Sequence, residues 1–301
     1  MHPERQYLKL ISNILKNGIL EKGRNGNTKT IIGATMRFPL NDNIIPIMTT
    51  KKLAWKTCFK ELFWFINGET DNKKLKKQNV NIWNGNGSRE FLDSRGLEHY
   101  EEDDLGPIYG YQWRNFDMPY RNTKHYEKYK NNIYLQIETK KHYKDQLLDI
   151  IESLKDDNEK NSRRLVMSAW NPNQLNKMAL PPCHILSQFN VINNKLYCNM
   201  YQRSADIGLG VPFNIASYSL LTILLAKHCD LEPGEFIHHI GNAHIYEEHE
   251  EMLNEQINRE PKKFPKCVIL NKYRDIEDYS MKDILIEDYI HHNKINMEMK
   301  V

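Results

Sequence analysis

Cysteine is scarce in this 301-residue chain, and none of its five cysteines belongs to a C-x-x-C pair. This odd, scattered set excludes a disulfide framework and a typical zinc site, and it indicates reduced thiols in an intracellular compartment. No stretch approaches eighteen uninterrupted apolar residues, so we expect no membrane span. The first residues carry charge and break their apolar run, so we expect no secretory signal peptide. We expect a cytoplasmic protein, or one that reaches the nucleus by diffusion.

An excess of charge of one sign is also lacking. The 42 lysines and arginines nearly balance 39 aspartates and glutamates, which leaves a formal charge of +3. This balance argues against a dedicated nucleic-acid-binding protein with a basic face, but it is compatible with a local anion site. No proline-, glycine- or serine-rich linker divides the chain, and no repeat is visible. We therefore expect one domain over residues 1–301.

Hydrophobic periodicity predicts both helices and strands. Runs that are apolar at helical spacing, or on most faces, predict helices over residues 7–17, 52–66, 145–157, 214–231 and 247–260. Runs rich in β-branched and aromatic residues predict strands over 30–40, 44–50, 163–170, 184–192, 195–204 and 235–246. Helices and strands in this order are typical of a single α+β domain.

Residues 122–143 contain many lysines, asparagines and tyrosines without a clean period. We interpret this segment as a surface insertion, and a solvated loop is the expected conformation. No function is assigned to it.

The stretch MALPPCHILSQF places Cys183 and His184 side by side after two prolines. A thiol becomes a nucleophile only as the thiolate, so a group that lowers its pKa is needed nearby. His184 is a poor candidate for a base, because adjacent residues on a strand point to opposite faces. A second unusual stretch, YQRSADIGLGVPFNIASY, concentrates polar residues and glycines before a predicted buried helix.

These two stretches belong to a set of motifs through which the chain resembles the thymidylate synthase family over nearly its whole length. The matching motifs are FKELFWFINGET, IWNGNGSREFLDSRG, DLGPIYGYQWRNF, RRLVMSAWNP, LPPCH, YQRSADIGLGVPFNIASY, GNAHIYEEH, REPKKFP and KINMEMKV, in family order and spacing. The resemblance implies a large mixed β-sheet packed by helices, with a sheet face that forms a homodimer interface. It also implies reductive methylation of dUMP to dTMP by 5,10-methylenetetrahydrofolate, with release of dihydrofolate and without a metal.

The resemblance assigns this chemistry to a few residues. Uracil C5 is a weak nucleophile, and addition of the Cys183 thiolate to C6 would turn C5 into an enolate carbon. Arg203 is expected to stabilise the thiolate and to hold phosphate. Glu61 matches the family's acid–base glutamate, and burial on an apolar helix predicts a raised pKa for it. Tyr109 matches the tyrosine associated with removal of the C5 proton, while His184 is expected to support only the local hydrogen-bond network.

The family match also implies the nucleotide contacts. The amide of Asn214 can accept from uracil N3–H and donate to O4, a pair of contacts that cytosine cannot reciprocate. His244 and Tyr246 match the ribose-binding pair and alternate on a predicted strand, so they would point to the same side. A dianionic phosphate suits guanidinium groups, and Arg163 and Arg164 would come from the other subunit of an obligate dimer. The residues expected to bind dUMP are Arg24, Arg163, Arg164, Cys183, His184, Gln202, Arg203, Ser204, Asp206, Asn214, His244 and Tyr246.

For the folate, the match implies that Asp206 meets the pterin ring and that the tail of the chain closes over the cofactor through backbone groups. The residues expected to bind folate are Trp83, Asn86, Asp206, Leu209, Gly210, Phe213, Lys300 and Val301.

The chain departs from the family pattern at three places. The phosphate loop, R-T-G-T-G-T in the family, stands here as RNGNTKT and is one residue shorter before Gly33, which makes Arg24 the least secure phosphate ligand. The family's aspartate before AHIY is Asn242 here. The insertion after Arg121 has no counterpart.

Three other functions compete with this interpretation. A dCMP or dUMP hydroxymethylase on the same fold would quench the methylene intermediate with water instead of hydride, although Asn214 favours uracil. A catalytically idle relative that binds RNA is a second alternative, against which the intact Cys183, Arg203, Asn214 and Glu61 argue. A cysteine hydrolase is the weakest, since no oriented His–Asn or His–Asp partner can be placed.

Overall fold

The computed structural model describes residues 1–23, 26–132, 134–136 and 143–299. Its centre is a six-stranded sheet in the order β1-β2-β6-β5-β4-β3. The β5–β6 pair is parallel and the other neighbouring pairs are antiparallel. The expected α+β domain with a large mixed sheet is therefore confirmed. The strands of this sheet are β1 (Ile19–Gly23), β2 (Gly26–Pro39), β3 (Val166–Ser168), β4 (His184–Ile192), β5 (Lys195–Asp206) and β6 (Glu232–Tyr246).

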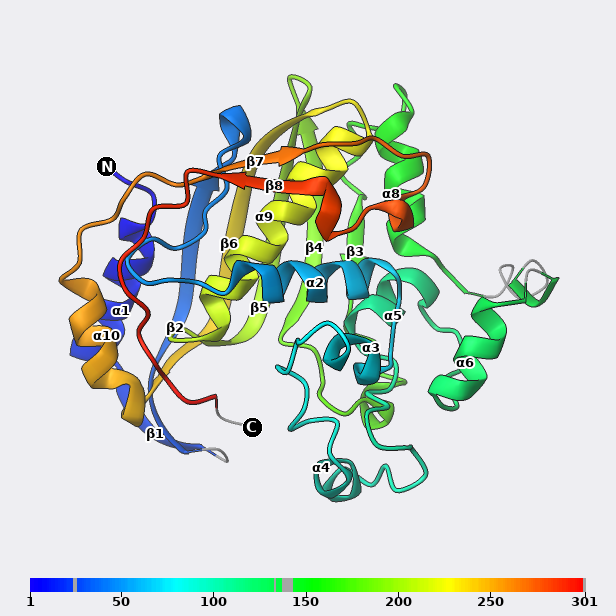
Figure 1. Ribbon diagram of the computed structural model, residues 1–301, viewed down its shortest axis with the longest axis horizontal. Helices are drawn as coiled ribbons and strands as arrows, with labels where there is room; N and C mark the ends of the chain where they lie inside the picture. The colour runs from blue at the N-terminus through cyan, green and yellow to red at the C-terminus, as the bar shows by residue number, and fades with distance from the viewer. Residues whose placement is uncertain (24–25, 133, 137–142, 300–301) are drawn as a thin grey trace.

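Helices cover one face and both ends of this sheet (Figure 1). The nineteen-residue α9 (Gly210–His228) is apolar on nearly all sides because it lies between the sheet and α2 (Trp55–Ile66). By length and composition α9 could span a membrane, but most of it is buried in the domain core. α1 (Arg5–Asn17) and α10 (Glu250–Ile257) lie side by side near β1 and β2 (Figure 1).

Shorter elements complete the domain. A two-stranded antiparallel sheet of β7 (Lys266–Ile269) and β8 (Ile284–Glu287) crosses above α9 (Figure 1). The remaining elements are α3 (Asn72–Lys76), α4 (Arg89–Ser94), α5 (Tyr109–Asn115), α6 (Thr123–Lys130) and α8 (Gln146–Lys155).

The two faces of the sheet differ in character. On the face toward α9, Phe189, Cys198 and Met200 are fully buried. On the opposite face, the cross-strand pair Leu186 and Tyr201 leaves large apolar surface exposed. Val166 and Ile192 are exposed on that same face. Exposed apolar side chains gathered on one sheet face are typical of an interaction surface.

The strand predicted over 44–50 is wrong. Only Ile44 forms an isolated bridge, to Lys266. Pro46 has no N–H to donate to a ladder, and the N–H groups of Thr49 and Thr50 donate to the buried carboxylate of Glu4. The apolar run was misleading because these side chains are buried individually in the core and not on a sheet.

The solvated loop expected for the insertion is wrong for residues 123–130, which form α6. Tyr126 and Tyr129 of this helix are buried, and Tyr126 lies edge-on to Tyr111, with ring centroids 4.8 Å apart. The sequence did not predict this helix because it is short and its two buried residues are tyrosines among lysines, which give no clear apolar period.

Candidate active site

Cys183 is half-buried at the start of β4, where Arg203 from the neighbouring β5 holds its lead-in. The guanidinium donates from Nε to the carbonyl of Pro182 at 2.8 Å and from one Nη to that of Pro181 at 3.0 Å. The same Nη lies 3.9 Å from Cys183 Sγ, and the face of Trp170 stacks on the guanidinium. The carbonyls of the two prolines thus hold the arginine beside the thiol.

The electrostatics of Cys183 combine opposing influences. Burial raises the pKa of the thiol above its ordinary value, while the charge of Arg203 and the hydroxyl of Tyr109 lower it. Arg203 acts in the expected direction, but burial outweighs it. The thiolate therefore forms at the site only with further stabilisation or with a base that takes the proton.

His184 points away from the thiol and into the domain. Its Nδ1 lies 2.6 Å from the hydroxyl of Tyr218, and its ring stacks on Tyr109 at a centroid distance of 4.1 Å. Burial, reinforced by the nearby His238, lowers the pKa of His184 to about 3. The imidazole is neutral at physiological pH, and its position fits a structural partner better than a base.

Two acid–base candidates, Tyr109 and Glu61, lie near the thiol. The hydroxyl of Tyr109 accepts a 2.8 Å hydrogen bond from the Cys183 backbone N–H. Glu61 on α2 accepts a 2.6 Å hydrogen bond from Trp83 Nε1, and Trp83 is edge-on to Tyr109. Burial raises the pKa of Glu61 to about 7, although the Trp83 bond opposes the shift. The raised pKa predicted from the apolar helix is confirmed.

The turn between β5 and α9 carries the residues expected to meet base and folate. Asp206 Oδ1 accepts from the N–H groups of Gly208 and Leu209, at 2.9 and 3.3 Å. A Cβ built on Gly210 would lie 3.9 Å from Asn214 Oδ1, so Asn214 and Asp206 flank the same glycine. The Asn214 amide makes no hydrogen bond within the described part of the chain and is available to a ligand. Phe213 is half-buried against the core.

The ribose candidates line a polar cavity of about 600 Å³ together with residues of β1 and β2. His244 and Tyr246 both face this cavity, and His244 Nδ1 lies 2.9 Å from Asn242 Oδ1. Adjacent strands pair Asp206 with His244 and Ser204 with Asn242. The parallel β5–β6 pair thus brings the two candidate sets together.

Some expected residues lie elsewhere. Arg163 and Arg164 are exposed before the edge strand β3 and do not line the cavity at His244. Gln202 is buried and bonded to His238 and to the Ser204 carbonyl, so its side chain is already engaged. Asn86 is buried. The predictions for Arg24, Lys300 and Val301 lie outside the described residues.

Sequence analysis missed three residues close to the site. Lys51 is buried and donates to the carbonyl of Gly208 at 2.5 Å, and burial lowers its pKa to about 8. Tyr218 anchors His184, and Trp170 stacks on Arg203. For Tyr218 and Trp170, their presence inside the matched motifs was the available signal, whereas Lys51 lies outside those motifs.

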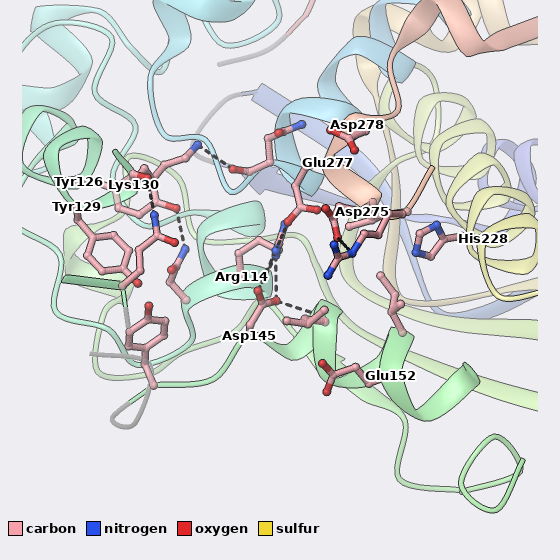
Figure 2. Close-up of a pocket in the computed structure, with 18 of the residues that line it drawn as sticks. Arg114, Tyr126, Tyr129, Lys130, Asp145, Glu152, His228, Asp275, Glu277 and Asp278 are labelled. Carbon is pink, nitrogen blue, oxygen red and sulfur yellow. Dashed lines mark hydrogen bonds and ion pairs between the residues drawn. The ribbon is translucent and has the colours of Figure 1, made fainter. Parts of the chain in front are cut away.

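A separate cavity of about 650 Å³ lies between α5, α6, α8 and residues 274–278 (Figure 2). At its floor, Arg114 binds Asp145, Glu277 and the carbonyl of Ile66. None of the expected site residues lines it. In the described ranges, no group of three or more His, Cys, Asp or Glu side chains could hold a metal ion.

A thiol close to an arginine, with a buried carboxyl group of pKa about 7 connected to it through Trp83 and Tyr109, is typical of enzymes that use a cysteine nucleophile. Comparison with known proteins makes this specific. The family model described as thymidylate synthase matches residues 5–301, and the chain belongs to that family.

The relatives matched are larger proteins. A bifunctional dihydrofolate reductase-thymidylate synthase from Leishmania amazonensis is 48% identical over 303 residues, covering 100% of this chain and 56% of the relative. Relatives of the same description from Zea mays and Paramecium tetraurelia are 48% and 47% identical, covering 100% of this chain and 55% and 62% of their own lengths. The chain thus spans about half the length of the curated relatives it matches.

Proposed function

We propose that this protein converts dUMP to dTMP with 5,10-methylenetetrahydrofolate and releases dihydrofolate, through a covalent bond between Cys183 and C6 of the pyrimidine. The observation that carries this proposal is the arrangement of Cys183 between Arg203 and Tyr109 in a chain that matches the family from residue 5 to 301. The relatives' printed names include the same synthase activity.

The nucleotide occupies the space between the β4–β5 ends and the cavity lined by His244 and Tyr246. Those two side chains hold the ribose, and Arg203 and Ser204 hold the phosphate with Arg24. Asn214, whose amide has no partner among the described residues, reads the base. Cys183 then lies below C6.

The reaction begins when the Cys183 sulfur forms a bond to C6 and the electron pair of the C5–C6 double bond moves to C5 and O4. The folate supplies the one-carbon unit, which C5 attacks, and later a hydride that completes the methyl group. The C5 proton leaves before that transfer, and the sulfur departs from C6 with its bonding pair. Atoms balance with dTMP and dihydrofolate as products.

The chain's own groups handle the protons. The phenol of Tyr109 lies close to the thiol and is in position to assist removal of the C5 proton. Glu61 titrates at about 7 and can both accept and donate a proton near neutral pH. We assign it to O4 and to the departing folate nitrogen, through water.

The folate lies over the nucleotide against the 206–213 turn. Asp206 is assigned to the pterin, with Trp83, Asn86, Leu209, Gly210 and Phe213 along the rest of the molecule and Lys300 and Val301 closing over it.

We propose a homodimer joined through the exposed sheet face. Val166, Leu186, Ile192 and Tyr201 expose apolar surface there, and burial of such surface is the usual basis of a stable subunit interface. Arg163 and Arg164 do not line the protomer's own cavity, as expected if each completes the partner's phosphate site. We place the protein in the cytoplasm.

Spectrophotometric detection of dihydrofolate formed from dUMP and methylenetetrahydrofolate tests the proposal. A hydroxymethylase would form a hydroxymethyl nucleotide without dihydrofolate, and an idle RNA-binding relative would form neither. Absence of dihydrofolate from a folded, dUMP-binding protein would refute the assignment.

A further inference from the structure

We propose that the insertion helix α6 and Tyr120 act as positioning elements for Tyr109, through the carboxylate of Asp104. This inference rests on the proposed function, because the consequence expected is slower loss of the C5 proton. It assigns a role to the segment that has no counterpart in the family motifs.

Asp104 is the centre of the arrangement and is almost fully buried. One carboxylate oxygen accepts from the hydroxyl of Tyr120 at 2.6 Å and from the N–H of Gly106 at 3.0 Å. The other accepts from the N–H of Thr123, the first residue of α6, at 2.8 Å. A buried carboxylate requires such donors. Asp104 therefore connects the start of α6, through Thr123, to the loop that follows Asp104 itself, through Gly106.

The loop from Asp104 to Tyr109 packs closely against residues 177–179, which precede Cys183. Leu105 accepts from the N–H of Ala179 at 3.0 Å, four residues before Cys183. Gly106 has a φ of +73°, and a Cβ there would lie 2.1 Å from the carbonyl of Lys177. The loop therefore fills the space between α6 and the segment that leads to the nucleophile.

Tyr109 itself needs support from its surroundings. Its φ is +22°, a value that residues with side chains rarely adopt, and such a conformation persists only where neighbouring structure imposes it. The next residue, Gly110, packs directly on the backbone of Phe65, since a Cβ there would lie 2.2 Å from the Phe65 carbonyl. With Gly110 fixed, Asp104 holds the other end of the turn.

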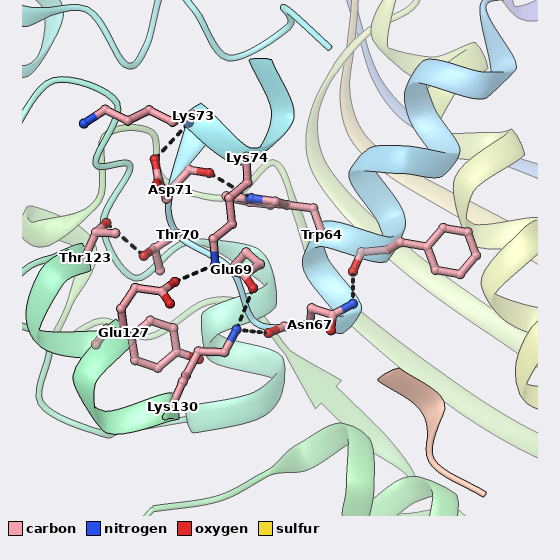
Figure 3. A network of polar contacts seen from close by, with 12 residues as sticks. Trp64, Asn67, Glu69, Thr70, Asp71, Lys73, Lys74, Thr123, Glu127 and Lys130 are labelled. Carbon is pink, nitrogen blue, oxygen red and sulfur yellow. Dashed lines mark hydrogen bonds and ion pairs between the residues drawn. The ribbon is translucent and has the colours of Figure 1, made fainter. Parts of the chain in front are cut away.

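Ion pairs attach α6 to the same region (Figure 3). Lys130 donates to Glu69 at 2.6 Å, and Lys74 bridges Glu69 and Glu127, also at 2.6 Å each. Thr70, next to Glu69, lies 3.0 Å from Thr123 between their hydroxyls, and its carbonyl accepts from the N–H of Leu105. The helix α6 is thus bonded both to residues 69–74 and to Asp104, which begins the loop that leads to Tyr109.

The test replaces Tyr120 with phenylalanine in the full chain, which removes one donor to Asp104 and keeps the ring. We expect kcat for dTMP to fall about tenfold, because small misplacements of a reacting group have effects of this order or larger. Release of tritium from C5 of labelled dUMP should slow in parallel, with KM for dUMP unchanged. The covalent complex with 5-fluoro-dUMP and folate should form as in the wild type, since it requires no removal of a C5 proton.

Tyr279→Phe is the matched control, since Tyr279 is also buried but lies outside α6, and its hydroxyl bonds the N–H of Tyr273 and not Asp104. It should lower Tm comparably while kcat stays near wild type. Equal kcat in Tyr120→Phe and wild type, or equal losses in both variants, would overturn the proposal. Hydrogen exchange of the amides of residues 105–110 gives an activity-independent readout: faster exchange in Tyr120→Phe alone supports the proposal, and unchanged exchange overturns it. An inactive wild type would refute the proposed function and leave this second readout decisive.

Discussion

Replacement of Glu61 with glutamine should make the protein more stable and the enzyme nearly inactive. The pKa of Glu61 rises from an ordinary 4.5 to about 7 because burial disfavours the charged carboxylate. Above pH 4.5 the unfolded chain releases this proton while the folded chain keeps it, so folding stability falls as the pH rises toward 7. Above pH 7 both states are ionised and the loss is constant.

The magnitude follows from these two values. Since each unit of pKa difference is worth roughly 1.4 kcal/mol, the folded wild type loses about 1 kcal/mol at pH 5.5 and about 3 kcal/mol at pH 8.5. Glutamine keeps an oxygen that can accept the Trp83 hydrogen bond and carries no charge. The gain from Glu61→Gln should therefore increase by about 2 kcal/mol between these pH values.

Urea unfolding at one protein concentration, at pH 5.5, 7 and 8.5, measures this difference. Glu69→Gln is a control of opposite sign: burial would raise the pKa of Glu69, but Lys130 and Lys74 lower it, so this variant should lose stability. The kcat of Glu61→Gln should fall at least about 100-fold, and the pH–rate limb near 7 should disappear. A stability gain that does not grow with pH would refute the reasoning.

Three further predictions concern the reaction. Cys183→Ser should abolish dTMP formation while dUMP still binds, and a rate above about one per cent of wild type would contradict the nucleophile assignment; mass spectrometry of the 5-fluoro-dUMP adduct should locate it on the Cys183 peptide. Arg164→Ala and Cys183→Ser homodimers should each be weak or dead, and mixing them under subunit exchange should restore activity in one of two sites; no recovery would show that the arginine is not shared in trans. Asn214→Asp should weaken dUMP methylation and admit dCMP, because each unpaired buried polar group costs roughly 1–3 kcal/mol; an unchanged ratio of kcat/KM for the two nucleotides would exclude Asn214 as the base reader.

Regular periodicity is what made parts of the fold predictable. β4 was predicted to the residue, since its buried and exposed positions alternate, and α9 was recognisable from its length and uniform apolarity. The false strand at 44–50 shows the limit: buried apolar residues predict burial, and the partner of each backbone N–H decides the conformation.

The site likewise contains residues that the sequence predicted and residues that it did not. Residues inside recognisable motifs, such as Cys183 and Arg203, could be named in advance, and the structure brings them together. Lys51 could not, because its partner Gly208 is distant in sequence and its burial depends on the assembled fold. The role of α6 likewise depends on contacts to Asp104 and Glu69 that no local pattern reveals.

The strand order has a consequence for how the chain folds during synthesis. Thr28 of β2 pairs with Tyr246 of β6. About 200 further residues must therefore be synthesised after β2 before the whole of its partner strand β6 is available. At about 5–20 residues per second, this interval lasts on the order of ten seconds or more. During that time the β1–β2 hairpin presents an open edge to other nascent chains. Aggregation during translation, and dependence on chaperones that bind unpaired strands, should therefore be greatest before residue 246 emerges.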